Sequence, residues 1–184
     1  NIQIDFSGRL TLERTEAVAT IKNDDNLLIT VTGINGAEAG AVPAKFIFSL
    51  PGNYTADIPT LINYTLGGQA TAGGTDYVGN VNGVIAIPAG DESVVLSLPV
   101  KDDDIVEKDE EITITINSII TNYPGNITYN PALPIVKIID NDATVLRLSN
   151  AVQLPEGNSG VTAFTYNITL LKATGTNFTV KYAT

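Results

Sequence analysis

Short runs of alternating hydrophobic and polar residues make up most of this chain, which is the pattern of half-buried β-strands. At 112–116, isoleucine occupies every second position and threonine the positions between, so one face of the run is apolar. Similar runs lie at 2–6, 45–50, 61–65 and 94–98. Glycine, asparagine, aspartate and proline separate the runs, and a single helical turn at 107–111 is the most helix that we expect. The sequence therefore predicts an all-β fold, a sandwich of short strands.

Parts of the sequence recur at a nearly constant spacing. Three pairs are separated by 118 residues: Glu38 and Glu156, 46–48 and 164–166, and 62–64 and 180–182. The run 20–25 recurs as 137–142, at a spacing of 117 residues. A spacing of this size matches the length of a whole domain, and it indicates tandem copies of one domain.

The repeat divides the chain into three parts. Residues 26–143 form one complete copy, the central copy. Residues 1–25, the N-terminal flank, match the tail of a preceding copy, and residues 144–184, the C-terminal flank, match the head of a following one. Neither flank has enough strands to close a sandwich, so we expect order only where a flank leans on other material. No Gly/Ser-rich linker separates the copies, which predicts a stiff array.

Composition excludes several classes of function. The net charge is −10, from 20 acidic and 10 basic residues, which disfavours nucleic acid and anionic membranes as partners. There is no cysteine and no histidine, so thiolate chemistry, zinc–cysteine sites and the usual general base are absent. No apolar run approaches the ~18 residues of a membrane helix, and we expect no insertion into membranes. We also expect that the protein is not an enzyme.

The run 101–111 places seven carboxylates within eleven residues, between two strand-like runs. Two unit charges ~4 Å apart repel by about 1 kcal/mol even in water, so a cation would stabilise such a cluster. Clustered oxygens suit a hard ion such as Ca²⁺. A solvated acidic loop that blunts the edge of a strand is the alternative, and the run alone does not decide between the two.

Five motifs follow one another along the central copy. They are Glu38, a glycine-rich box at 68–77, Pro-Ala-Gly at 88–90, the acidic run 102–110 and Asp-Asn-Asp at 140–142. In this order, and with one extra residue in the box, they resemble the Calx-β family, first recognised in sodium–calcium exchangers. That family also occurs in tandem in large adhesins and extracellular-matrix proteins.

The resemblance implies a Greek-key, immunoglobulin-like β-sandwich of about seven strands, with acidic loops that bind Ca²⁺ at one end. The family's ligand positions fall here on Glu38, Asp76, Asp102, Asp103, Glu107, Glu110, Asp140 and Asp142. The closing triplet is often three aspartates, and Asn141 in its middle removes one negative charge. The remaining carboxylates of the acidic run, Asp104, Asp109 and Glu111, are expected to face water. Tyr77 is expected to pack in or beside the core.

Both flanks contain acidic residues at equivalent places, namely Asp24, Asp25 and Glu156. Each lacks its partner loops, so no complete site is expected in the flanks. The expected function is a calcium-binding structural repeat of a large secreted or cell-surface adhesin, of the attachment or gliding-motility type. Its partners would be adjacent repeats of the same chain and a surface or protein ligand of the parent adhesin. A regulatory calcium sensor of a transporter and a ligand-recognition module are the alternatives.

Overall fold

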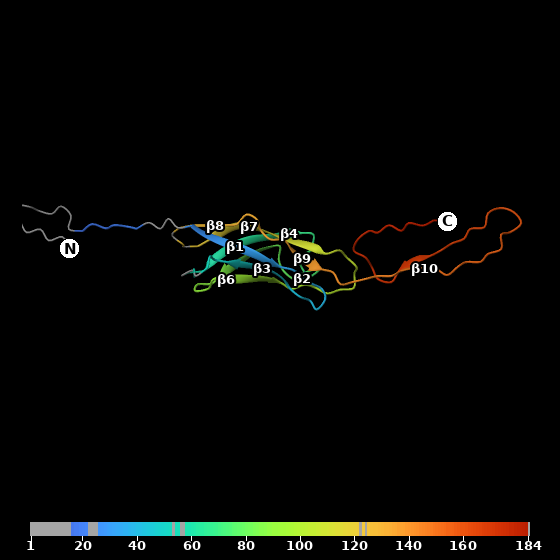
Figure 1. The fold of residues 1–184 in the computed structure, drawn as a ribbon, viewed down its shortest axis with the longest axis horizontal. Helices are drawn as coiled ribbons and strands as arrows, with labels where there is room; N and C mark the ends of the chain where they lie inside the picture. Colours follow the sequence, from blue (N-terminus) through green and yellow to red (C-terminus); the bar gives the residue numbers. More distant parts are fainter. Residues whose placement is uncertain are drawn as a thin grey trace, which may run out of the picture.

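The computed structural model describes residues 16–21, 26–52, 54–55, 58–121, 123 and 125–183. All regular structure in these ranges is β, which confirms the predicted fold class (Figure 1). The described residues contain no helix that could cross a membrane. The expected strand at 2–6 and the acidic pair Asp24 and Asp25 lie outside the described residues.

Nine strands of the central copy form two sheets that pack face to face (Figure 1). The first sheet contains, in spatial order, β6 (Ser93–Leu98), β3 (Ala44–Ser49), β1 (Asn26–Ile34) and β8 (Asn126–Tyr129). The second contains β2 (Gly36–Ala37), β9 (Val136–Ile139), β7 (Glu110–Ile120), β4 (Thr60–Gly68) and β5 (Asn82–Ile87). Neighbouring strands are antiparallel except for β1 with β8 and β2 with β9, which are parallel. The predicted sandwich is confirmed.

There are more than the expected seven strands because the first and last strands each divide between the sheets. The chain passes from β1 to β2 through Asn35, whose Oδ1 accepts a hydrogen bond from the Lys137 backbone N–H at 2.9 Å. Gly33 lies against β9, and a Cβ there would be 2.5 Å from Val136 Cγ1. The link from β8 to β9 contains Pro134, which also contacts this glycine. The two crossings therefore lie side by side and tie the sheets together.

The core lies between the two sheets and follows the period-two pattern of the sequence. Ile112, Ile114 and Ile116 of β7 are buried, whereas the threonines between them are half-buried or exposed. Phe46 and Phe48 of β3 are fully buried opposite them. Burying a side chain of this size contributes about 1.5–3 kcal/mol relative to leaving it exposed. The alternation in the sequence is thus the alternation of core and surface.

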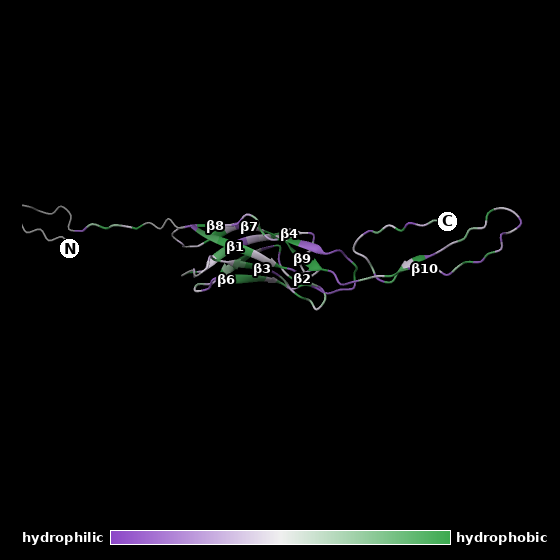
Figure 2. Ribbon diagram, in the orientation of Figure 1, coloured by the Kyte–Doolittle hydropathy of each residue, from purple (hydrophilic) through white to green (hydrophobic). Residues whose placement is uncertain are grey.

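Two further strands lie in the C-terminal flank, beyond the sandwich (Figure 1). β10 (Leu146–Leu148) and β11 (Ile168–Leu170) form an antiparallel ribbon. In the central copy, Thr30 of β1 pairs with Ser49 of β3, and their counterparts 118 residues later are Leu148 and Asn167. In the ribbon, Leu148 pairs with Ile168 and not with Asn167. The register of the ribbon therefore differs by one residue from that of β1 and β3. The ribbon therefore does not repeat the pairing of the central copy. Figure 2 shows hydrophobic residues concentrated in the sandwich strands, with shorter stretches along the flank.

Candidate metal centre

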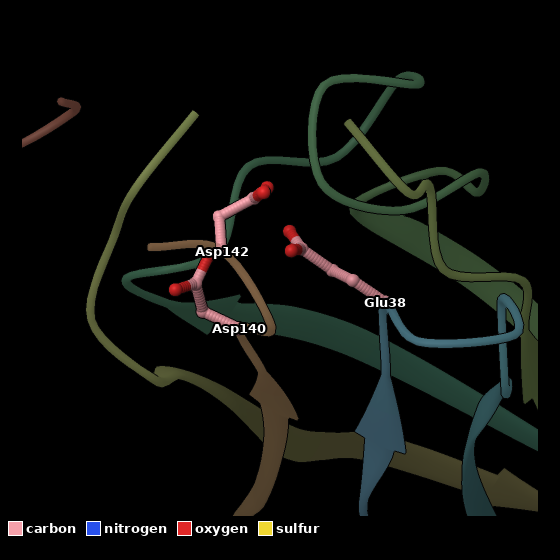
Figure 3. A group of neighbouring side chains, drawn as sticks. All are labelled: Glu38, Asp140 and Asp142. Atoms are coloured by element: carbon pink, nitrogen blue, oxygen red, sulfur yellow. The ribbon is translucent and has the colours of Figure 1, made fainter. Parts of the chain in front are cut away.

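Acidic side chains converge at the end of the sandwich from which the C-terminal flank leaves. Glu38 follows β2 directly and Asp140 follows β9, and these two parallel strands are paired at Ala37 and Ile139. Because parallel neighbours end at the same edge, the two carboxylates come together. Asp142 joins them, and one carboxylate oxygen from each of Glu38, Asp140 and Asp142 lies within 4.8 Å of the others (Figure 3).

A second group consists of Asp76, Glu107 and Glu110, which also offer oxygens within 4.8 Å of one another. They come from the turn between β4 and β5, from the loop before β7 and from the first residue of β7. Glu38 and Asp140 of the first group line one small pocket together with all three members of the second. The two groups are therefore neighbours at one end of the molecule.

The turn that carries Asp76 is fixed by local contacts. Gly68, at the end of β4, has φ of 112° and lies directly against the Glu111 carbonyl, where a Cβ would clash. Asp76 Oδ2 accepts a hydrogen bond from the Thr71 backbone N–H at 2.5 Å. The next residue, Tyr77, is 1% exposed and belongs to the core, as the sequence predicted. Burial of this ring holds the turn, and with it the carboxylate, over the end of the sandwich.

Asp102 and Asp103 lie beside the two groups and belong to neither. Asp102 Oδ1 accepts a hydrogen bond from Asn141 Nδ2 at 3.5 Å, so the asparagine of the closing triplet contacts the acidic loop. Asp103 Oδ1 accepts a hydrogen bond from the Ile105 backbone N–H at 2.8 Å, which shapes the loop itself. The structure thus gathers six of the eight predicted residues into two groups. Their role as metal ligands stays a prediction.

Burial and mutual repulsion raise the pKa of three of these carboxyl groups. Burial is the main cause for Glu38, and together with the charge of Asp140 it raises the pKa of this group to about 7. Burial is also the main cause for Glu110, and together with the contact with Asp76 it raises that pKa to about 7. For Glu107, burial and then the charge of Asp76 are the largest causes of a raised pKa. Desolvation and like charges both disfavour the ionised form, and a cation bound here would favour it.

Four buried carboxylate oxygens have no hydrogen-bond partner within the described part of the chain. They are Glu38 Oε2, Glu110 Oε2, Asp140 Oδ1 and Asp142 Oδ2. Leaving a buried polar group unpaired costs about 1–3 kcal/mol, and more when it is charged. All the converging atoms are oxygens from carboxylates, which is the donor set that Ca²⁺ prefers. The residues present therefore fit a calcium ion.

A lysine of the C-terminal flank reaches the same end of the sandwich. Lys172 Nζ donates to Asp104 Oδ1 at 2.9 Å and to Asp142 Oδ1 in a shorter hydrogen bond. The hydrogen bond with Lys172 lowers the pKa of Asp104, and the two partners together raise the pKa of Lys172. Sequence reasoning missed this residue, because no motif marks Lys172 and its contact depends on how the flank folds back.

The backbone of the flank also pairs with the acidic loop. The Val106 N–H donates to Ala173 O at 3.0 Å, and the Gly175 N–H donates to Val106 O at 3.0 Å. Gly175 lies so close to Glu107 that a Cβ would clash with its carboxylate. This short parallel bridge is where the flank leans on the central copy. It joins the candidate metal centre to the C-terminal flank.

The carboxylates expected to face water do so to different degrees. Asp104 has 89% of its side chain exposed although it pairs with Lys172. Asp109 is exposed, and Glu111 is half-buried and lies 3.8 Å from Lys137 Nζ. In the C-terminal flank, Glu156 is exposed.

No model of a known protein family matches the sequence, and no curated protein matches it. Solved structures similar in fold include the apo-form Calx CBD1 domain, with a TM-score of 0.47 and 20% identity over 62% of this chain and 98% of that chain. Calcium binding domain CBD12 of CALX1.1 has a TM-score of 0.47 and 21% identity over 61% of this chain and 44% of that one.

CBD12 from CALX1.2 has a TM-score of 0.43 and 21% identity over 63% of this chain and 45% of that one. These neighbours are Calx domains, the kind of domain that the sequence motifs resemble.

Proposed function

We propose that the central copy is a calcium-binding structural domain that holds Ca²⁺ at the end of its sandwich. The observation that carries the proposal is the set of buried carboxylate oxygens without a partner, on Glu38, Glu110, Asp140 and Asp142. Each of the two clusters of three acidic residues offers oxygens for one ion. Bound Ca²⁺ would neutralise charges that otherwise repel one another in a site of low dielectric constant.

The ligands come from segments that are far apart in the sequence, and this supports a structural role for the ion. The turn at 71–76, the acidic loop and the exit from β9 would all be held together by one cluster of charges. Binding to the folded state alone adds RT ln(1 + [L]/Kd) to stability, about 2.7 kcal/mol at a hundredfold excess over Kd. Asp142 leads straight into the C-terminal flank, so the ion would also fix the direction in which the next repeat leaves.

We infer further that this domain is one repeat of a large secreted or cell-surface adhesin, of the attachment or gliding-motility type. The tandem copies, the short junctions and the low content of charge away from the site support this setting. The domain would extend and stiffen an array and present a terminal binding region. Its partners would then be adjacent repeats and the surface or protein to which the adhesin attaches, and the domain itself would not be an enzyme.

A regulatory calcium sensor of a transporter is the second candidate. The observation that favours it is the hydrogen bond from Lys172, in the following copy, to Asp142 at the candidate metal centre. A change of occupancy at the centre could then change how the two copies sit. Affinity separates the two candidates, because extracellular modules bind with Kd of roughly 10⁻⁴ to 10⁻³ M and sensors bind more tightly.

Thermal unfolding of the chain in millimolar Ca²⁺ and in EDTA tests calcium binding. We expect the Tm to be higher in Ca²⁺ by roughly 5–20 °C, from the linkage above and about 2–8 °C per kcal/mol for domains of roughly 60 to 250 residues. Glu107→Ala should remove most of the shift, and the exposed Asp109→Ala is the matched control that should keep it. The same Tm in Ca²⁺ and in EDTA would refute the proposal.

A further inference from the structure

One carboxylate of the candidate metal centre already holds a positive charge. Lys172 Nζ donates a hydrogen bond to Asp142 Oδ1, and the side chain of Asp142 is only 8% exposed. The Lys172 side chain is 37% exposed, and its other partner, Asp104, faces water. Lys172 therefore reaches from the surface to a buried carboxylate of the centre.

The two oxygens of Asp142 are in different situations. Oδ1 accepts the hydrogen bond from Lys172, whereas Oδ2 is buried and has no partner within the described part of the chain. Asp142 forms one group with Glu38 and Asp140, each of which also has a buried oxygen without a partner (Figure 3). An ion bound by this group would thus share the Asp142 carboxylate with Lys172.

Two cations on one carboxylate oppose each other. The ammonium group already satisfies part of the attraction of Asp142 for positive charge, and it repels Ca²⁺, whose charge is twice its own. Salt screens such effects between exposed groups that lie far apart, but much less when the groups are close and partly buried. Lys172 therefore acts against an ion in this group.

Lys172 is also the cation in direct contact with the centre. Among the described residues, no other lysine or arginine forms an ion pair with a member of either group, because Lys137 pairs with Glu111, which belongs to neither. Lys108 lines the small pocket between the groups but forms no ion pair there. The charge that opposes an ion at Asp142 thus comes from the C-terminal flank.

The contact is compatible with a complete copy of the domain after Asp142. The counterpart of Lys172, 118 residues earlier, is Tyr54, in the segment that joins β3 to β4. β3 is antiparallel to β1 and pairs Ser49 with Thr30, so the chain leaves β3 toward the start of β1, where the sandwich begins. In a complete following copy, residues near 172 would likewise lie at the end that faces the preceding sandwich.

We propose that Lys172 sets the calcium affinity of the centre, by competing electrostatically with the ion for Asp142. The proposal rests on the calcium-binding function proposed above. Coupling of this kind is reciprocal, so bound Ca²⁺ weakens the hold of Lys172 by the same factor by which Lys172 weakens the hold on Ca²⁺. Asp142 is neutralised by the flank when Ca²⁺ is scarce and by the ion when it is plentiful. The grip on the flank at Lys172 is therefore firmer in the empty state.

Isothermal titration of the 184-residue chain with Ca²⁺ tests the proposal. Lys172→Gln removes the charge and keeps a hydrogen-bond donor, so Kd should fall by roughly fivefold or more, the range usual for coupling between two sites. Lys172→Arg keeps the charge and should bind Ca²⁺ as the original chain does. Lys181→Gln removes the same charge from an exposed position of the same flank, and it should leave Kd unchanged.

Thermal unfolding in EDTA gives a second measurement, in which the expected effect has the opposite sign. Without Ca²⁺, Lys172→Gln leaves the buried Asp142 carboxylate without its counter-charge, so its Tm should lie below that of the original chain. The rise in Tm on adding Ca²⁺ should then be larger in this variant. Lys181→Gln should change neither value. A residue with a merely structural role would lower the Tm without tightening calcium binding.

Two outcomes separate this proposal from the calcium-binding function. If the original chain binds Ca²⁺ and Lys172→Gln binds it with the same or a higher Kd, the role of Lys172 is wrong and calcium binding stands. If neither chain shows a heat of binding or a shift of Tm with Ca²⁺, the calcium-binding function fails, and the role of Lys172 fails with it.

Discussion

Glu38 gives the sharpest test of the electrostatics at the candidate metal centre. It is 4% exposed, and burial with the charge of Asp140 raises its pKa to about 7, from 4.5 for the free group. Between these two values the folded state holds a proton that the unfolded state releases. In EDTA, the contribution of Glu38 to the free energy of unfolding is therefore greatest below pH 4.5 and is lost as the pH rises through 7.

The size of this loss follows from the shift. A shift of 2.5 pKa units corresponds to about 3 kcal/mol at 1.36 kcal/mol per unit. Glu110, whose pKa is also raised to about 7, acts in the same direction. Calcium reverses the trend, because an ion that binds the ionised carboxylates stabilises the folded state more as the pH rises.

Denaturant unfolding at several pH values between 5 and 8, in EDTA and in Ca²⁺, measures these effects. Glu38→Gln removes the titration and keeps the shape, so in EDTA at pH 8 it should be more stable than the original chain by about 3 kcal/mol. It should also gain little from Ca²⁺. Glu156 is the exposed counterpart of Glu38 in the C-terminal flank, and Glu156→Gln is the control. It should change neither the stability in EDTA at pH 8 nor the stability gained from Ca²⁺.

Two results would refute this role of Glu38: an original chain in EDTA that becomes more stable between pH 5 and 7.5, or a Glu38→Gln variant that is no more stable than the original chain at pH 8. The first result would mean that the carboxylates are not desolvated. The second would mean that Glu38 does not repel its neighbours in the folded state.

Two further predictions concern the junction and the sheet crossing. Lys172→Ala should speed hydrogen exchange of the Gly175 amide, whose N–H donates to Val106 O. Substitution of the exposed Lys181 by alanine is the control and should leave this exchange unchanged. Equal exchange rates in the two variants would contradict the role of Lys172. Gly33→Ala should lower the free energy of unfolding by about 1–3 kcal/mol, because the added Cβ would meet the Val136 side chain. Gly52→Ala is the control, because nothing lies within 4 Å of a Cβ there, and it should be nearly neutral. A denaturant titration of both variants measures the difference.

The strands and the core were predictable because each depends on local alternation. Ile112, Ile114 and Ile116 had to share one face, and that face had to be buried. The division of the first and last strands was not predictable in this way. Gly33 and Pro134 are its local signals, and their meaning depends on contact between segments about a hundred residues apart.

The candidate site was predictable in part. The acidic run alone indicated a cation, but the partners Glu38 and Asp140 followed only from the family resemblance, because no local pattern reveals that β2 and β9 lie in parallel register. Glu107 and Glu110 are half-buried, whereas Asp109 is exposed, and this difference depends on where β7 begins. Lys172 lies in the C-terminal flank, and residues 26–143 contain no signal for it.

The parallel pairing of the first and last strands also determines how the domain bears tension. The chain enters at the start of β1 and leaves after β9, at opposite ends of the sandwich (Figure 1). A pull on both ends therefore acts along the strands and loads the hydrogen bonds of β1 with β8, and of β2 with β9, in shear. Those bonds share the load together and do not open one after another. The topology thus gives the sandwich a mechanical clamp aligned with the direction from the start of β1 to the end of β9.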